Sequence, residues 1–69
     1  MLAKKSFSLA GHRTSVALEA EFWAVLDAEA KRSGTSLAAL VARIDAARAE
    51  RPLASALRLH ALAAAGKGG

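Results

Sequence analysis

Residues 13–18 of this 69-residue chain read RTSVAL, and this stretch decides the fold. Polar and apolar side chains alternate along it, which is the pattern of a β-strand with one buried face. The side chains divide between two faces, with Thr14, Val16 and Leu18 on one and Arg13, Ser15 and Ala17 on the other. The β-branched residues at positions 14 and 16 strengthen the prediction of a strand.

Helices are predicted after this strand. The first runs from Glu19 to Ser33, and Gly34 supplies the left-handed position that ends many helices. Thr35 or Ser36 is the N-cap of a second helix, which should end near Arg51 because a proline at position 52 disfavours helical geometry in the residue before it. A third helix is predicted over residues 53–65. The last four residues, GKGG, are predicted to be a frayed tail.

The segment before the strand allows two interpretations. Phe7 and Leu9 alternate with serines, so residues 6–10 form either an extra short strand or part of a flexible basic arm over residues 1–12. Gly11 indicates a turn over residues 10–12. The organisation predicted is this amino-terminal segment, a core over residues 13–51, a carboxyl-terminal helix over residues 52–65 and a tail over residues 66–69.

The predicted core is defined by larger apolar side chains with strand or helix periodicity. Its members are Val16, Leu18, Phe22, Leu26, Leu37, Leu40, Val41 and Ile44. Phe22 and Trp23 are neighbours on one helix, so their rings point about 100° apart. We expect Phe22 in the core and Trp23 at a dimer contact or a contact with the third helix.

Composition points to a polyanionic partner. The formal net charge is +4, and the only ionisable side chains before Glu19 are basic: Lys4, Lys5, His12 and Arg13. The chain has no cysteine, its two histidines are far apart, and no catalytic set of side chains stands in a persuasive context. We therefore expect no enzyme activity, no metal and no cofactor. No stretch is long and apolar enough to span a membrane, and a soluble, cytoplasmic protein is expected.

A single good strand with unpaired backbone groups requires a partner strand. A twofold axis supplies one, if residues 13–18 of two chains form an antiparallel ribbon. The predicted fold is therefore mainly α with a short β-strand: an intertwined homodimer with an intermolecular antiparallel β-ribbon, two helices per chain packed on it, and a third, carboxyl-terminal helix.

A two-stranded ribbon fits the major groove of B-DNA, where base edges display a distinct pattern for each base pair. The outer face of the ribbon would read bases through Arg13, Ser15 and Ala17. The first amides of the second helix have no acceptor within the helix, so this end attracts anions. We expect DNA phosphates to be bound there and by the basic amino-terminal segment, through Thr35, Ser36, Leu37, Lys4, Lys5 and His12.

The segments GHRTSVALEAEFW (residues 11–23) and SGTSLAAL (residues 33–40) resemble the short bacterial ribbon-helix-helix proteins, the class of the Arc and MetJ repressors. The resemblance implies a homodimer that binds operator DNA, with Arg13, Ser15 and Ala17 on bases and Ser36 with Leu37 on phosphate. Ala17 departs from the pattern, because this position is often polar or basic in the class.

Three functions follow from these expectations. The leading hypothesis is a sequence-specific, double-stranded-DNA-binding transcriptional repressor or regulator. A variant is an antitoxin, in which the third helix contacts a protein partner. The alternative is a structural or protein-interaction dimer that does not bind DNA, which the apolar Ala17 favours and the basic amino-terminal segment opposes.

Overall fold

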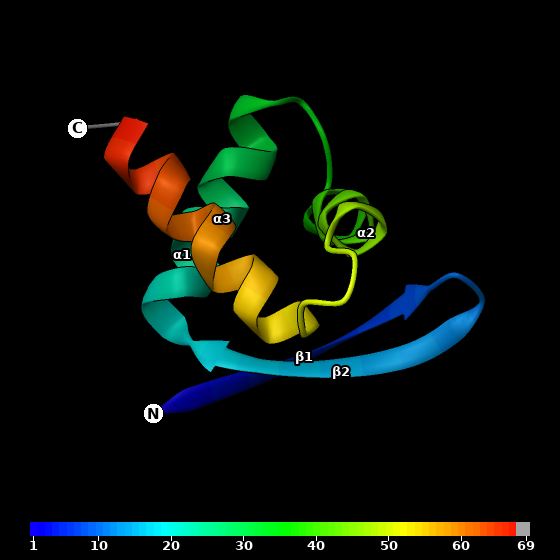
Figure 1. Cartoon of the computed structure of the whole chain (residues 1–69). Helices are drawn as coiled ribbons and strands as arrows, with labels where there is room; N and C mark the ends of the chain where they lie inside the picture. The colour runs from blue at the N-terminus through cyan, green and yellow to red at the C-terminus, as the bar shows by residue number, and fades with distance from the viewer. Residues whose placement is uncertain (68–69) are drawn as a thin grey trace.

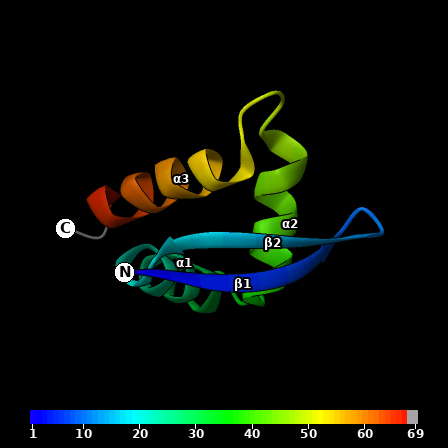
Figure 2. The ribbon, with the colours of Figure 1, turned by 90° about the horizontal axis from the view of Figure 1, so that it is seen from below.

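The computed structural model describes residues 1–67, which form a β-hairpin followed by three helices (Figure 1). The elements are β1 (Leu2–Leu9), β2 (His12–Glu19), α1 (Ala20–Arg32), α2 (Leu37–Ala47) and α3 (Leu53–Lys67). The hairpin forms one layer and the helices lie together on one side of it, so the other face of the hairpin is turned outward (Figures 1 and 2).

The two strands pair with each other along their whole length. The antiparallel register runs from Leu9 opposite His12 at the turn to Leu2 opposite Glu19 at the open end. The expectation that the strand lacks a partner in its own chain is therefore wrong, and the ribbon in this structure is intramolecular rather than built from two chains. Of the two interpretations of the amino-terminal segment, the strand is confirmed. This strand begins earlier in the chain than predicted. The sequence does not reveal its first part, because residues 2–6 are all exposed and show no apolar alternation.

The hairpin turn consists of only two residues. Ala10 has a φ of 51° and Gly11 a φ of 81°, and two successive positive values define the type I′ turn that matches the twist of antiparallel strands. Gly11 adopts this conformation freely, whereas the Cβ of Ala10 makes it costly. His12, expected in the turn, is instead the first residue of β2.

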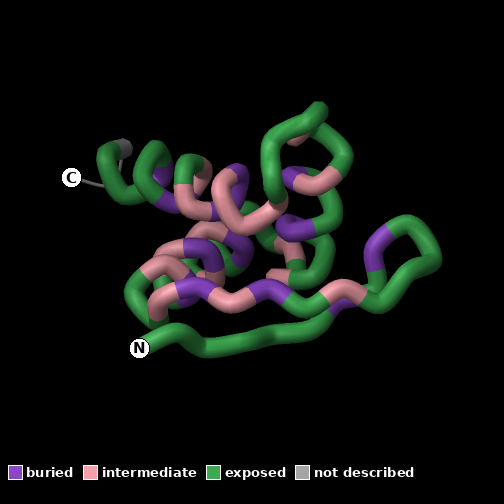
Figure 3. Tube along the Cα trace, turned by 60° about the horizontal axis from the view of Figure 1, so that its bottom comes forward, coloured by how far each residue is buried: buried purple, intermediate pink, exposed green. Residues whose placement is uncertain are grey.

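The core lies between the inner face of the hairpin and the helices. Val16 and Leu18 are buried, as predicted, and burial alternates along β2 (Figure 3). The other predicted core residues are buried in the same cluster (Leu26, Leu40, Val41, Ile44) or partly buried against it (Phe22, Leu37). The residues missed by the sequence analysis come mainly from the two ends of the chain: Phe7, Leu9, Ala56, Leu57 and Ala61.

The aromatic pair on α1 is reversed relative to the prediction. Trp23 is the buried ring, with 4% of its surface exposed, and Phe22 is only partly buried. The indole Nε1 of Trp23 donates a 2.7 Å hydrogen bond to the carbonyl of Ala3, and its ring lies 5.8 Å from that of Phe7. Strand β1, which was not anticipated at its full length, covers this side of α1 and explains the difference.

The helix boundaries agree with the sequence analysis to within one residue except at the ends of α2 and α3. Helix α1 ends before Gly34, whose φ is 72°. Helix α2 ends at Ala47 rather than near Arg51, because Ala49 has a φ of 56° and leaves the helical region before Pro52 is reached. Gly66 and Lys67, predicted to fray, belong to α3, and residues 68–69 of the predicted tail lie outside the described residues.

The strained residue of the turn gives a direct test of the hairpin. Ala10→Asn is expected to raise the free energy of unfolding by about 1 kcal/mol, because asparagine tolerates the left-handed region better than alanine does. Ala10→Val is expected to lower it by about 1–2 kcal/mol, because a β-branched residue is strained there. Urea denaturation followed by circular dichroism measures both. Changes of the same sign in the two variants would contradict the turn geometry.

Candidate nucleic-acid interface

The outward face of the hairpin is built from directly opposed residues, which share a face of an antiparallel pair. These pairs are Lys4 with Ala17, Ser6 with Ser15, and Ser8 with Arg13. All six residues are exposed except Ala17, which is half-buried. The three predicted base-reading residues therefore do lie on one face, and this face turns away from the helices (Figure 2).

Two further residues of this face were missed by the sequence analysis. Ser6 and Ser8 come from β1 and lie beside Ser15 and Arg13, and the Oγ atoms of Ser6 and Ser15 are 3.0 Å apart. The signal was present in the alternation of these serines with Phe7 and Leu9. It could not be assigned because the register between the strands was unknown.

The basic residues of the hairpin divide between its two faces. Lys4 and Arg13 lie on the outward face, whereas Lys5 and His12 have register positions on the inner face, opposite Val16 and Leu9. The Nζ atom of Lys5 lies 5.8 Å from the centre of the Trp23 ring, a cation–π contact at the edge of the hairpin. The predicted phosphate-binding set is thus not a single cluster.

The amino terminus of α2 lies on the β1 side of the hairpin (Figure 2). Ser36 is the N-cap, as predicted, and its Oγ accepts a 3.0 Å hydrogen bond from the amide of Ala39. Leu37 lines a shallow hollow together with Lys5 and Trp23, so the start of α2 and the edge of β1 are neighbours. First-turn amides such as that of Leu37 have no acceptor within a helix, and together with the helix dipole they favour an anion here.

Thr35 has a different role from the one predicted for it. Its amide donates a 2.9 Å hydrogen bond to the carbonyl of Ala30, so the backbone of Thr35 closes the end of α1. Its side chain is partly buried, whereas Ser36 is exposed. Of the two candidate caps, Ser36 is the one that caps α2.

The open end of the hairpin is held to the helices by an ion pair. Arg58 of α3 donates through Nε to Oε1 of Glu19 at 3.0 Å, and its guanidinium lies 6.0 Å from the centre of the Phe22 ring. A hydrogen bond from the backbone amide of Glu19 itself, and next the Arg58 side chain, lower the pKa of the Glu19 carboxyl. This contact joins the last residue of β2 to α3.

Other kinds of site have little support in the part of the chain that the structure describes. Residues 1–67 contain no group of three or more histidine, cysteine, aspartate or glutamate side chains that could hold a metal ion. No helix among the same residues has the length and apolar character needed to cross a membrane.

Comparison with known protein families gives one match. The profile of a family described as a ribbon-helix-helix domain matches residues 2–65, which include the hairpin and nearly all of the three helices. No curated protein and no solved structure matches the chain significantly.

The ion pair at the open end of the hairpin predicts a pH dependence. Because the pKa of Glu19 is lower in the folded than in the unfolded chain, its contribution to stability is complete above the unfolded-state value and is lost as the pH falls through the folded-state value. Glu19→Gln is therefore expected to make stability less sensitive to acid below the ordinary pKa of a glutamate. Urea denaturation at pH 7 and in acid checks this, with Glu21→Gln, an exposed residue of α1, as the matched control. Equal acid sensitivity of the native chain and Glu19→Gln would contradict it.

Proposed function

The chain belongs to the ribbon-helix-helix family, and from this membership we propose that it binds double-stranded DNA as a transcription regulator. Ribbon-helix-helix domains typically bind DNA, as regulators or as antitoxins. In the proposed complex the outward face of the hairpin enters the major groove, which accepts a two-stranded β-ribbon. The amino terminus of α2 binds a phosphate beside it.

The observation that carries this proposal is the location of the uncompensated positive charge. The ion pairs of the described residues join Asp27 to Lys31, Glu29 to Arg32, Asp45 to Arg48 and Glu19 to Arg58. None of these pairs involves Lys4, Lys5 or Arg13. The hairpin therefore keeps its cations available, and no acidic residue precedes Glu19 at its open end.

The outward face carries the chemistry needed to read base edges. Arg13 provides two parallel donors that match the N7 and O6 acceptors of guanine, and Ser15 donates or accepts. We add Ser6 and Ser8 to the proposed readers because they lie beside these two residues. Ala17 offers only an apolar contact, such as one with a thymine methyl group. Lys4 lies next to Ala17 and supplies a phosphate or base contact at this end of the ribbon.

The proposed protein is a homodimer, as is usual in this family, and each chain brings a complete hairpin to it. Repression follows if the dimer blocks access of the polymerase to an operator, and such a protein acts in the cytoplasm, on the nucleoid. The antitoxin variant has one observation in its favour: α3 exposes Leu59 and Leu62, with 46% and 58% of their surfaces accessible. These side chains are suited to a contact with another protein.

A fluorescence-anisotropy titration with genomic DNA fragments at several salt concentrations tests the proposal. Phosphate contacts release counterions, so the affinity should fall steeply between about 50 and 200 mM salt. No DNA binding at about 50 mM salt would reject it and would favour a protein-interaction dimer. Selection from random duplexes then identifies the operator, and sedimentation of the free protein gives the oligomeric state.

Substitutions on the outward face separate base reading from phosphate binding. Arg13→Ala is expected to weaken binding to the selected operator by about 1–3 kcal/mol and to relax preference at one position of the site. Lys4→Ala should weaken binding to all sequences alike and lower the salt slope by about 1. Lys31→Ala is the control, because the end of α1 lies on the far side of the molecule from the hairpin (Figure 1). Equal operator affinity of Arg13→Ala and the native chain would remove Arg13 from the reading face.

A further inference from the structure

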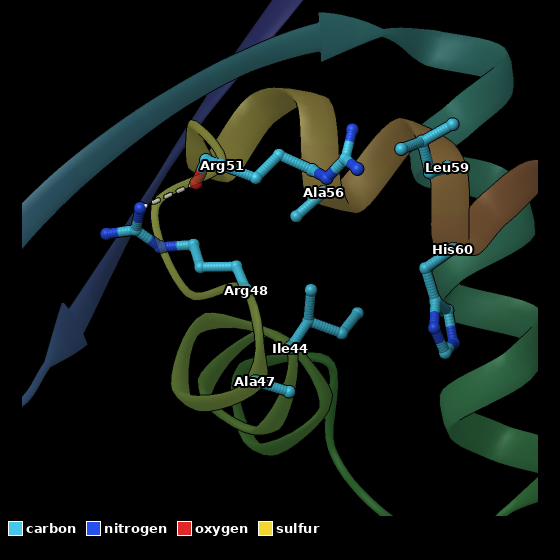
Figure 4. Close-up of a pocket in the computed structure, with 7 residues that line it drawn as sticks. All are labelled: Ile44, Ala47, Arg48, Arg51, Ala56, Leu59 and His60. Atoms are coloured by element: carbon cyan, nitrogen blue, oxygen red, sulfur yellow. Dashed lines mark hydrogen bonds between the residues drawn. The ribbon is translucent and has the colours of Figure 1, made fainter.

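A groove lies between the carboxyl-terminal half of α2 and the first half of α3 (Figure 4). It is open to solvent and has a volume of about 480 Å³. The apolar part of its wall consists of Ile44, Ala47, Ala56 and Leu59. Leu59 is unusually exposed for a leucine, so this wall offers apolar surface that the chain itself does not cover.

Two arginines lie at one end of the groove, and they differ in their contacts. Arg48 is already engaged: its Nε donates to Asp45 at 2.6 Å and one terminal nitrogen donates to the carbonyl of Arg51 at 2.7 Å. The guanidinium of Arg51 has no hydrogen bond or ion pair with any described residue, and it extends along the groove near Ala56 (Figure 4). The uncompensated charge of the groove is therefore that of Arg51.

His60 of α3 also borders the groove, but its imidazole points away from Arg51, toward α1 (Figure 4). The Nε2 atom of His60 is buried and has no hydrogen-bond partner in the described part of the chain. Buried polar atoms are nearly always paired, because an unpaired one loses its hydration without compensation. Because the Nε2 atom of His60 is buried while the groove is open to solvent, a molecule in the groove does not reach it, and Arg51 is the group that would hold an anion there.

We propose that this groove binds a small organic acid, with its carboxylate on Arg51 and its apolar body against Ile44, Ala56 and Leu59. Guanidinium and carboxylate form the strongest class of charge-assisted hydrogen bond, and an apolar wall adds affinity only for an anion with an apolar body. The site is separate from the DNA-facing surface, because Ser36 and Ala47 lie at opposite ends of a helix about 16 Å long.

The direct test is a titration of the full chain with benzoate, followed by ¹H–¹⁵N correlation spectra. Saturable shifts are expected in the amides of the residues that line the groove. Benzamide, which has the same shape without charge, should bind at least about tenfold more weakly, since loss of one charge-assisted hydrogen bond costs about that much. Sulfate, which has charge without an apolar body, should also bind more weakly, because it buries no apolar surface against the wall. Sulfate binding as tight as that of benzoate, or shifts confined to the hairpin, would overturn the proposal.

Variants show whether the named residues hold the acid. Arg51→Ala should weaken benzoate binding about tenfold, whereas Arg43→Ala, an exposed arginine of α2 outside the groove, should leave it unchanged. Ala47→Trp should fill the groove and abolish binding. Equal effects of Arg51→Ala and Arg43→Ala would overturn the proposal.

The same spectra test whether a protein, rather than a small organic acid, occupies the groove. Shifts of the groove amides with an acidic peptide but not with benzoate would overturn the small-molecule site in favour of a protein contact. Because benzoate binding is measured without DNA, its outcome is independent of whether the chain binds DNA.

Discussion

The backbone pairing of β1 with β2 is the interaction on which the rest of this structure depends. It satisfies those amides and carbonyls of β2 that point toward β1, and it brings Phe7 and Leu9 into the core from a segment that is otherwise polar. It also places the carbonyl of Ala3 where the indole of Trp23 donates to it, which fixes β1 against α1. The outward face exists as a surface only because the register opposes serines and basic residues of one strand to those of the other.

This pairing changes what a second chain has to supply. In the arrangement expected from the sequence, the ribbon and the core both require a dimer. In the structure the ribbon is complete in one chain, and α3 closes the core from the other side through Leu57 and Ala61, which are 0% and 1% exposed. The contribution of a second chain to DNA binding would then be a second hairpin and a defined spacing between two half-sites.

The sequence predicts the helices and the inner face of β2 well, because their apolar periodicity is strong. It fails at β1 because Lys4, Lys5 and Ser6 are exposed on both faces of a strand end and show no alternation. The turn itself is predicted from Gly11, but its two-residue form is not, because Ala10 occupies a position usually taken by asparagine, aspartate or glycine. The end of α2 is missed because the proline at position 52 sets only an upper limit, while Ala49 leaves the helix earlier. The sequence analysis ranks Phe22 and Trp23 in the wrong order, because the unpredicted length of β1 decides which ring is covered.

The positions of the acidic residues decide where the excess positive charge of the chain, +4, is located. Four of the six acidic residues pair with cations that follow in or beside the helices, so these pairs are neutral. Among the cations outside these pairs, Lys4, Lys5 and Arg13 lie in the hairpin, Arg43 lies on α2, and Arg51 lies beyond the end of α2 beside the groove. Two separate surfaces therefore attract anions. The outward face of the hairpin is extended and polar and is suited to a polyanion, whereas Arg51 beside the apolar wall of the groove is suited to a single carboxylate.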